Sequence, residues 1–213
     1  MVSRRTRDRL IKRLEESGIK SRRVLELILN TPRHLFLDEA LSHKAYEDVA
    51  LPIGYGQTLS QPYIVARMTE LLLNGSRPLN HVLEVGTGSG YQTSILAQIV
   101  KHVYSVERIK PLQDKARQRL HNIKLYNVSL KHSDGGFGWP EKGPFDAIIS
   151  TAAPAEVPQE LLNQLASDGM LVIPVGGSEQ FLTTYTRKGD SNEFLKVAHE
   201  PVRFVPLLSG ITS

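Results

Sequence analysis

Residues Val82 to Ala97, VLEVGTGSGYQTSILA, form the most informative stretch of this chain. An apolar run of strand type leads into the glycine-rich turn Gly86 to Gly90, and a helical pattern follows at once. Glycines allow a tight turn and the close approach of a ligand to the backbone, while the start of a helix offers unpaired N–H groups. The stretch therefore predicts a ligand-binding turn between a strand and a helix, with a sharp turn that binds nothing as the alternative.

Short apolar runs and helical patterns alternate along the chain from this stretch onward. Five runs predict strands, and three intervals have helical spacing: strands at 81–85, 102–107, 127–134, 145–150 and 169–176, and helices at 91–101, 110–120 and 157–166. The runs 181–189 and 193–207 predict two late strands joined by a polar turn. Because strand and helix alternate, we expect an α/β fold with a doubly wound, mainly parallel, seven-stranded Rossmann-like sheet and helices on both faces.

The first 75 residues predict an N-terminal extension of helices and loops. One helix contains Leu10 and Leu14, a second begins after the capping residue Ser21, and a third runs from Pro62 to Leu73. A chain of 213 residues is short enough to build one core. We therefore expect a single domain over 1–213, made of an N-terminal region of helices and loops (1–75) and a Rossmann-like core that includes the C-terminal segment (76–213).

The composition excludes several kinds of chemistry. The chain has no cysteine, which rules out disulfides, thiolate nucleophiles and cysteine-ligated zinc. The N-terminus lacks the apolar run of a signal peptide, and no segment approaches the roughly 18 apolar residues of a membrane span. We expect a cytoplasmic protein without a membrane partner.

The positive charge is concentrated at the N-terminus. Residues 1–23 hold nine Lys or Arg against three acidic residues, whereas the whole chain has a net charge of +4. Such a cluster is typical either of a nucleic-acid patch or of a solvated helix face. No aromatic residues interleave with these charges, so we favour the solvated face and expect no stable nucleic-acid partner.

Three acidic residues at strand ends indicate the ligand. A dinucleotide turn needs a glycine where this chain has Tyr91, which disfavours NAD. Glu84 is placed to hold an ammonium group, Glu107 to accept hydrogen bonds from both ribose hydroxyls, and Asp134 with Gly135 to read an adenine amino group. An adenosine that carries an amino acid, S-adenosylmethionine, satisfies all three positions, although Glu107 as a surface acid and Asp134 as a turn residue remain alternatives.

The absence of certain residues limits the range of possible methyl acceptors. The residues after the fourth predicted strand, Ser150 to Pro154, lack the Asp or Asn followed by two prolines that methylation of base amino groups requires. Carbon-5 methylation of pyrimidines needs a cysteine. The seven histidines show no paired ligand spacing, so we expect no metal.

The chain resembles the protein-L-isoaspartate (D-aspartate) O-methyltransferase family from about Arg22 to Leu207. The resemblance lies in six motifs in order: ALPIGYGQTLSQP (50–62), VLEVGTGSGYQT (82–93), VYSVER (103–108), SDGGFGWPEKGPFDAIISTAAP (133–154), LVIPVG (171–176) and VRFVPL (202–207). It implies transfer of a methyl group from S-adenosylmethionine to the free α-carboxylate of L-isoaspartyl residues in damaged proteins and peptides. The products would be a methyl ester and S-adenosylhomocysteine.

The resemblance also implies a set of site residues. Ser60 matches the serine of the active site, and Val205, Pro206 and Leu207 match the segment along the substrate peptide. The cofactor would be held by Gln57, Thr58 and Leu59, by Glu84, Gly86, Thr87, Gly88 and Gly90, by Glu107, and by Asp134 with Gly135. Leu208 stands where many eukaryotic members have threonine. The resemblance further implies a methyltransferase-type sheet in which the order of the last two strands is exchanged. We expect a monomer or weak homo-oligomer.

The chemistry of this substrate explains why Ser60 needs no neighbouring general base. An isoaspartyl α-carboxyl has a pKa of roughly 3.5 and is ionised at neutral pH. Ser60 is therefore expected to align the nucleophile by one hydrogen bond. The alternatives are a small-molecule or RNA methyltransferase, a non-catalytic RNA-binding module and, last, an oxidoreductase.

Overall fold

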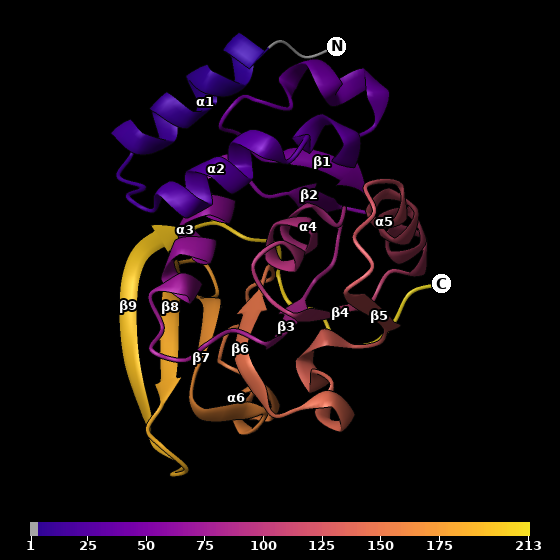
Figure 1. Cartoon of the computed structure of the whole chain (residues 1–213). Coiled ribbons are helices and arrows are strands. Elements are labelled where there is room, and N and C mark those ends of the chain that lie inside the picture. The colour runs from indigo at the N-terminus through magenta and orange to yellow at the C-terminus, as the bar shows by residue number, and fades with distance from the viewer. Residues whose placement is uncertain (1–3) are drawn as a thin grey trace.

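A computed structural model of the chain describes residues 4–213, so the first three residues of the predicted N-terminal region lie outside it. Seven strands form one sheet in the order β5-β4-β3-β6-β7-β8-β9 (Figure 1). Their bounds are β3 His81–Val85, β4 His102–Glu107, β5 Val128–His132, β6 Phe145–Ser150, β7 Leu165–Gly176, β8 Gln180–Arg187 and β9 Phe194–Val202. β8 alone runs in the opposite direction to the other six strands, which confirms the doubly wound, mainly parallel sheet.

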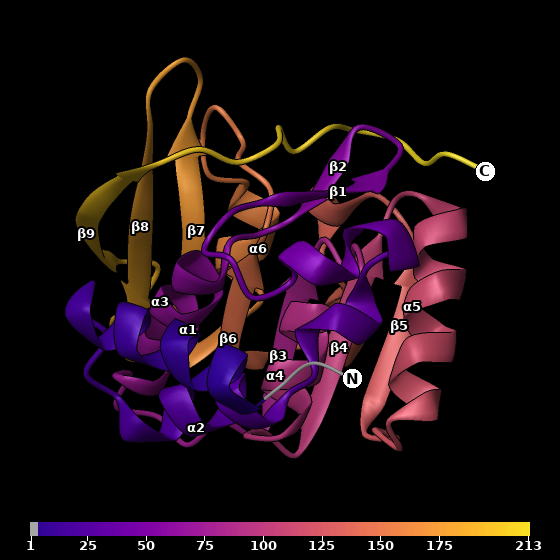
Figure 2. The ribbon, with the colours of Figure 1, turned by 90° about the horizontal axis from the view of Figure 1, so that it is seen from above.

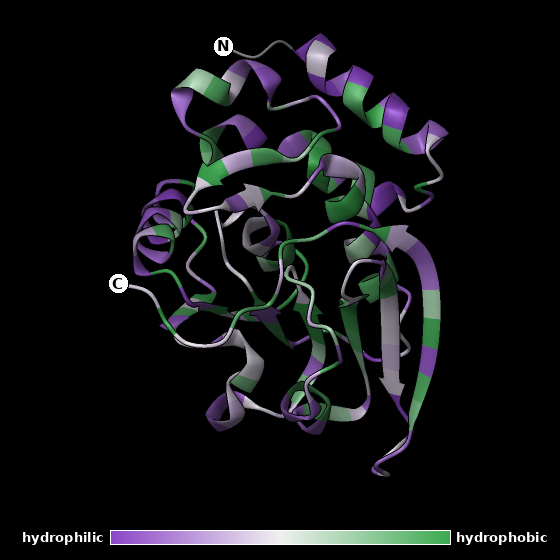
Figure 3. Cartoon of the chain, turned by 180° about the vertical axis from the view of Figure 1, so that it is seen from behind, coloured by the Kyte–Doolittle hydropathy of each residue, from purple (hydrophilic) through white to green (hydrophobic). Residues whose placement is uncertain are grey.

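Helices cover both faces of this sheet, because side chains of a strand alternate between its two faces. On one face, Val82, Val103 and Val172 belong to the apolar cluster that includes α3 Pro62–Leu73 and α4 Tyr91–Ala97. On the other face, Leu83 and Ile148 pack with α6 Gln159–Asn163. Figure 3 shows the central strands mostly in the green of apolar residues, as a sheet buried on both faces requires.

Several predicted element boundaries were wrong. The late strand predicted at 193–207 ends at Val202, as β9. The helix predicted at 157–166 is confined to α6, and β7 begins at Leu165 instead of 169. A register shift between Phe145 and Ala147, opposite Asp168 with its positive φ of 58°, lets the strand continue across this irregularity. The helix predicted at 91–101 ends at Ala97, while α5 Lys110–Asn122 is close to its prediction.

The N-terminal region contains more than helices and loops. Its helices are α1 Arg4–Glu16, α2 Arg22–Asn30 and α3, together with the 3-10 turns η1 Arg33–Phe36 and η2 Glu39–Lys44. Two more 3-10 turns, η3 Gly135–Phe137 and η4 Pro140–Lys142, lie in the core. A hairpin of β1 Leu51–Gly54 and β2 Gln57–Leu59 was not predicted. Its turn residues Tyr55 and Gly56 both have positive φ, as a two-residue hairpin turn requires.

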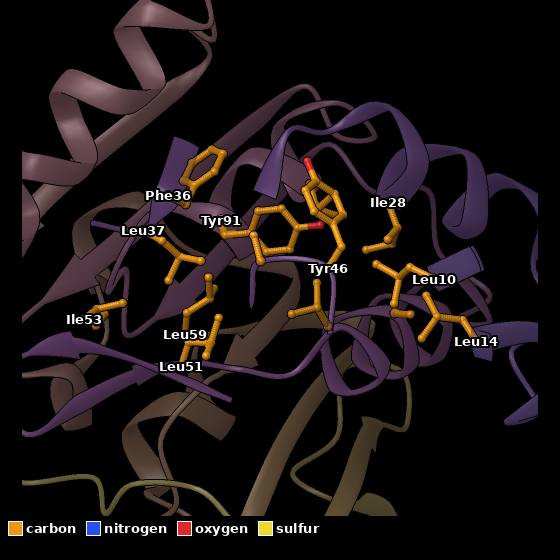
Figure 4. Packing of buried hydrophobic residues seen from close by; sticks show 14 of the residues in the cluster. Leu10, Leu14, Ile28, Phe36, Leu37, Tyr46, Leu51, Ile53, Leu59 and Tyr91 are labelled. Carbon is orange, nitrogen blue, oxygen red and sulfur yellow. The ribbon is translucent and has the colours of Figure 1, made fainter. Parts of the chain in front are cut away.

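This N-terminal region packs directly on the sheet core. Leu10 and Ile28 share one apolar cluster with the hairpin residue Leu59 and with Tyr91, the first residue of α4 (Figure 4). The cluster places the hairpin above the carboxyl ends of the central strands. Within residues 4–213, no helix has both the length and the apolar composition needed to cross a membrane.

Candidate active site

A cavity lined by many of the predicted site residues, here named the main cavity, lies at the carboxyl ends of β3, β4 and β6. In a doubly wound sheet the strand order reverses there, and ligands bind at this point. The free space of this cavity, counted together with the open mouth, is about 780 Å³. Its walls come from the hairpin, the strand ends and the C-terminal segment: Ile53, Gln57, Thr58, Leu59, Ser60, Val65, Val85, Gly86, Thr87, Gly88, Ser89, Gln92, Val106, Glu107, Arg108, Gly135, Thr151, Ala152, Val205, Pro206, Leu207 and Leu208.

The glycine turn forms the floor of the cavity. Gly86, with a φ of 93°, donates its N–H to the Val106 carbonyl at 2.8 Å and accepts at its own carbonyl from Thr151 Oγ1 at 2.8 Å. A Cβ at Gly86 would overlap the Thr151 hydroxyl. The positive φ and this close approach explain why glycine stands here.

Glu107, at the end of β4, presents a fixed carboxylate to the cavity. Its Oε2 accepts from the Gly88 N–H at 2.8 Å and its Oε1 from the Ile109 N–H at 2.9 Å. A carboxylate has about four acceptor sites, so two remain for ligand hydroxyl groups. This geometry fits the ribose contact expected from the sequence.

Glu84 lies behind the turn and is not part of the cavity wall. The side chain is fully buried, and its Oε2 accepts from Thr93 Oγ1 at 2.5 Å and from Ser105 Oγ at 2.6 Å. Ser105 Oγ in turn lies 2.6 Å from Oγ1 of Thr87, which does line the cavity. Burial raises the pKa of Glu84 to about 8, against the opposing effect of the two hydroxyl hydrogen bonds. In this position Glu84 supports the turn through hydroxyl groups.

Asp134 and Gly135 occupy different positions relative to the cavity. Gly135 lines it, whereas Asp134 accepts from the Gly136 N–H at 2.8 Å and from the Gly210 N–H at 2.6 Å. The carboxylate of Asp134 therefore fixes both its own turn and the C-terminal segment. Gly90 also stays outside the cavity wall and packs against Ala116 of α5.

Ser60 stands between two cavities. It lines the main cavity together with Gln57, Thr58 and Leu59, and it also lines a small hollow beside it. Counted in the same way as the main cavity, that hollow has about 320 Å³ of free space. Its walls are Ala50, Thr58, Ser60, Gln61, Ile64, Thr151, Arg203, Phe204 and Val205. The Ser60 hydroxyl makes no hydrogen bond to any residue in the range 4–213 and is available to a ligand.

The C-terminal segment 203–212, here named the strap, forms part of the cavity wall. It leaves β9 and runs across the sheet past the hairpin to α5 (Figure 2). The Val205 carbonyl accepts from the Ala153 N–H at 2.9 Å, and the Leu207 N–H donates to the Ala153 carbonyl at 2.8 Å. Further along, the Thr212 N–H donates to the Arg108 carbonyl at 2.7 Å. The strap thus brings Val205, Pro206 and Leu207 to the cavity.

Several wall residues were not expected from the sequence, among them Ile53, Val65, Gln92, Arg108, Thr151 and Ala152. Thr151 and Ala152 directly follow β6, so their position after a central strand was a usable signal. Gln92, inside a helix with an apolar pattern, gave none.

The residues present fit S-adenosylmethionine. Gly86 to Gly88 allow backbone contact, Glu107 offers two free acceptor sites near the turn, and Gly135 gives room where a Cβ would strike Val85. Among residues 4–213 there is no group of three or more His, Asp or Glu that could hold a metal ion. Fold and site together define the chain as a Rossmann-like S-adenosylmethionine-dependent methyltransferase.

Comparison with known proteins gives the family. Residues 5–212 match the model of the family described as protein-L-isoaspartate(D-aspartate) O-methyltransferase (PCMT). Relatives named protein-L-isoaspartate O-methyltransferase include one from Saccharophagus degradans, 68% identical over 100% of this chain and 95% of its own length, and one from Cellvibrio japonicus, 66% identical over 99% and 94%. A candidate enzyme of this name from Plasmodium falciparum, in complex with S-adenosylhomocysteine, has a TM-score of 0.81 at 27% identity and covers 94% of this chain and 97% of its own.

The chain therefore belongs to the protein-L-isoaspartate(D-aspartate) O-methyltransferase family. Membership confirms the activity and the cofactor expected from the sequence. The chain is an S-adenosylmethionine-dependent enzyme that methylates isoaspartyl residues of proteins.

Proposed function

We propose that Ser60 holds the acceptor, the free α-carboxylate of an L-isoaspartyl residue, at the junction of the two cavities. One observation carries the proposal: Ser60 lines both the cavity that fits the cofactor and the hollow next to it. Gln57, Thr58, Leu59, the glycine turn, Glu107 and Gly135 would hold S-adenosylmethionine in the main cavity. When bound, this cofactor supplies an electrophilic methyl group on a positively charged sulfur.

The ionisable groups around the junction suit an acceptor that arrives already charged. Of the described residues that line the two cavities, the ionisable ones are Glu107, Arg108 and Arg203. Both oxygens of Glu107 accept backbone N–H groups, which commits this carboxylate to the turn. A guanidinium group stays protonated at neutral pH, so an arginine cannot act as a general base. An acceptor of pKa roughly 3.5 needs no base, and the hydroxyl of Ser60 is left to donate to it.

Recognition of the peptide is proposed to use the strap. Its residues Val205 and Leu207 are bonded to Ala153, so the Pro206 carbonyl lies on the opposite edge of this extended segment. Main-chain hydrogen bonds read a peptide largely independently of its side chains. This suits an enzyme whose substrates share one altered residue in many sequence contexts.

Ser60→Ala tests the role of Ser60. A hydrogen bond to a charged group contributes about 1.5–3 kcal/mol, so kcat for an isoaspartyl peptide should fall roughly 10- to 100-fold. The Kd of S-adenosylhomocysteine should stay within twofold of wild type. Ser191→Ala, in the exposed turn between β8 and β9, is the matched control. The same peptide with normal Asp should receive no methyl ester, and an unchanged kcat in Ser60→Ala would remove Ser60 from the reaction.

We further propose that the chain acts as one domain over 1–213, as a monomer or weak homo-oligomer, in the cytoplasm and without a stable nucleic-acid partner. The apolar cluster shared by the N-terminal region and the core supports the single domain. Size-exclusion chromatography across a range of concentrations tests the oligomeric state. Salt-dependent binding of RNA at physiological ionic strength would contradict the last part.

A further inference from the structure

Arg33, the first residue of η1, is a fully buried arginine beside the proposed active site. Its exposed fraction is 0%, although arginine is among the residue types least often buried. Nη1 donates to the Ser60 carbonyl at 2.8 Å and Nη2 to the Val49 carbonyl at 3.3 Å. Val49 precedes β1 and Ser60 follows β2, so one guanidinium joins the two ends of the hairpin at its base.

The other contact of Arg33 is with the cofactor side of the site. The guanidinium carbon lies 5.2 Å from the ring centroid of Tyr91, a cation–π arrangement. Tyr91 is the first residue of α4 and follows the glycine turn directly. Its ring also meets Phe36 edge-on, with centroids 5.4 Å apart, inside the cluster drawn in Figure 4. A single side chain therefore contacts both the segment that carries Ser60 and the helix that follows the cofactor turn.

The environment of Arg33 is unusual for a merely structural side chain. No carboxylate of residues 4–213 forms an ion pair with it, and its Nε has no hydrogen-bond partner there. Burial lowers the pKa of Arg33 to about 10, against the raising effects of Tyr91, Asp48 and Tyr46. A buried cation without a paired charge destabilises a fold unless other contacts compensate. The contacts that it has are two carbonyl groups and one aromatic face, all at the boundary between hairpin and glycine turn.

We propose that Arg33 is a positioning residue for methyl transfer, which fixes the main chain of Ser60 relative to the glycine turn. It lines neither cavity and touches no reacting atom. It acts through the place that it gives to the Ser60 hydroxyl, and this inference rests on the role proposed for Ser60. A displacement of about 1 Å between reacting groups can lower a rate about 100-fold, so a clamp on the Ser60 carbonyl has a direct kinetic effect.

The test is Arg33→Lys, which keeps the charge but cannot donate to both carbonyls in the fixed geometry of a guanidinium. We expect kcat for an isoaspartyl peptide to fall 10- to 100-fold, with KM for the peptide and the Kd of S-adenosylhomocysteine within threefold of wild type. Arg77→Lys is the matched control. Arg77 also donates to a main-chain carbonyl, that of Ser167, at 2.9 Å, but sits at the amino ends of β3 and β6. This control should keep the wild-type kcat.

A double-mutant cycle separates this inference from the role of Ser60. If Arg33 acts through Ser60, then Arg33→Lys should change kcat less than twofold in a Ser60→Ala background. An undiminished effect in that background would overturn the inference and leave the role of Ser60 intact, as would a wild-type kcat in Arg33→Lys. If Ser60→Ala itself keeps the wild-type kcat, both proposals fall.

A second variant covers the case in which lysine disturbs folding. Arg33→Gln removes the buried charge and retains a planar group with two donors, but its side chain is too short to reach both carbonyls. It should show the same loss of kcat at a temperature below its thermal midpoint, with S-adenosylhomocysteine bound as tightly as in wild type. A loss of kcat that only follows a loss of cofactor affinity in both variants would refute a positioning role.

Discussion

The buried carboxyl of Glu84 should make the stability of this enzyme fall as the pH rises, and Glu84→Gln should remove that dependence. Burial raises the pKa of Glu84 from 4.5 to about 8. Below pH 4.5 the folded and unfolded chains both carry the proton, and the stabilisation is fully present. Between 4.5 and about 8 the unfolded chain releases the proton while the folded chain keeps it, so the free energy of unfolding falls. Above that window the loss is complete.

The size of the effect follows from the width of the window. One pH unit corresponds to about 1.4 kcal/mol, so the full window amounts to about 5 kcal/mol. Glutamine does not titrate, yet its amide oxygen can accept from Thr93 and Ser105 as Glu84 does. The gain in stability of Glu84→Gln over wild type should therefore grow by about 4 kcal/mol between pH 5 and pH 8.

Urea unfolding of the cofactor-free protein at each pH unit from 5 to 9 measures this difference. Titrating groups that do not interact with Glu84 are common to both proteins and cancel. Parallel pH profiles would refute the reasoning and would mean that Glu84 is ionised in the folded protein. The affinity for S-adenosylhomocysteine at pH 7 gives an independent result: because Glu84 does not line the cavity, Glu84→Gln should bind within threefold of wild type. A loss above tenfold would support the ammonium contact expected from the sequence.

Three further substitutions follow from the structure. Tyr91→Phe should raise the free energy of unfolding by about 1 kcal/mol in a thermal melt, because the buried hydroxyl of Tyr91 has no partner among residues 4–213. Asp146→Asn should lower it by about 2 kcal/mol without changing kcat, because Asp146 accepts from Arg77 at 2.5 Å and from the Asn80 and His81 N–H groups far from the cavity. Gly86→Ala should weaken binding of S-adenosylhomocysteine at least tenfold in calorimetry, because of the overlap with Thr151 and the positive φ, and full affinity would contradict this account of the turn.

The sheet was predictable because its strands are short apolar runs next to strong turn signals. β3, β4 and β6 coincide with their predicted ranges, since each is mostly buried and has a glycine or a polar residue at or directly after its end. The start of β7 was not predictable in the same way. The irregularity around Asp168 depends on pairing with β6, and no local pattern encodes it.

The candidate site was predictable only where the type and spacing of the residues themselves indicate a function. Glu107 could be placed from its position at a strand end, and the glycine turn from its spacing. Arg33 could not, because its partners are main-chain carbonyls of Val49 and Ser60, which carry no sequence signal. The hairpin turn at Tyr55 and Gly56 was missed for another reason: β1 and β2 are too short to show alternation, although a glycine-rich turn between two apolar residues is a hairpin signal.

The sheet topology explains why the last residues of the chain reach a site built by its middle. β8 is antiparallel to both β7 and β9, so β9 runs in the same direction as the parallel strands β3 to β7. Its carboxyl end therefore lies at the edge of the sheet where the glycine turn and Glu107 lie. The chain that leaves β9 after Val202 needs only to continue across that edge to become the strap, with Ala153, Asp134 and Arg108 bonding it in turn. The position of Val205 to Leu207 at the cavity is thus a consequence of strand direction, with β8 as the single reversal.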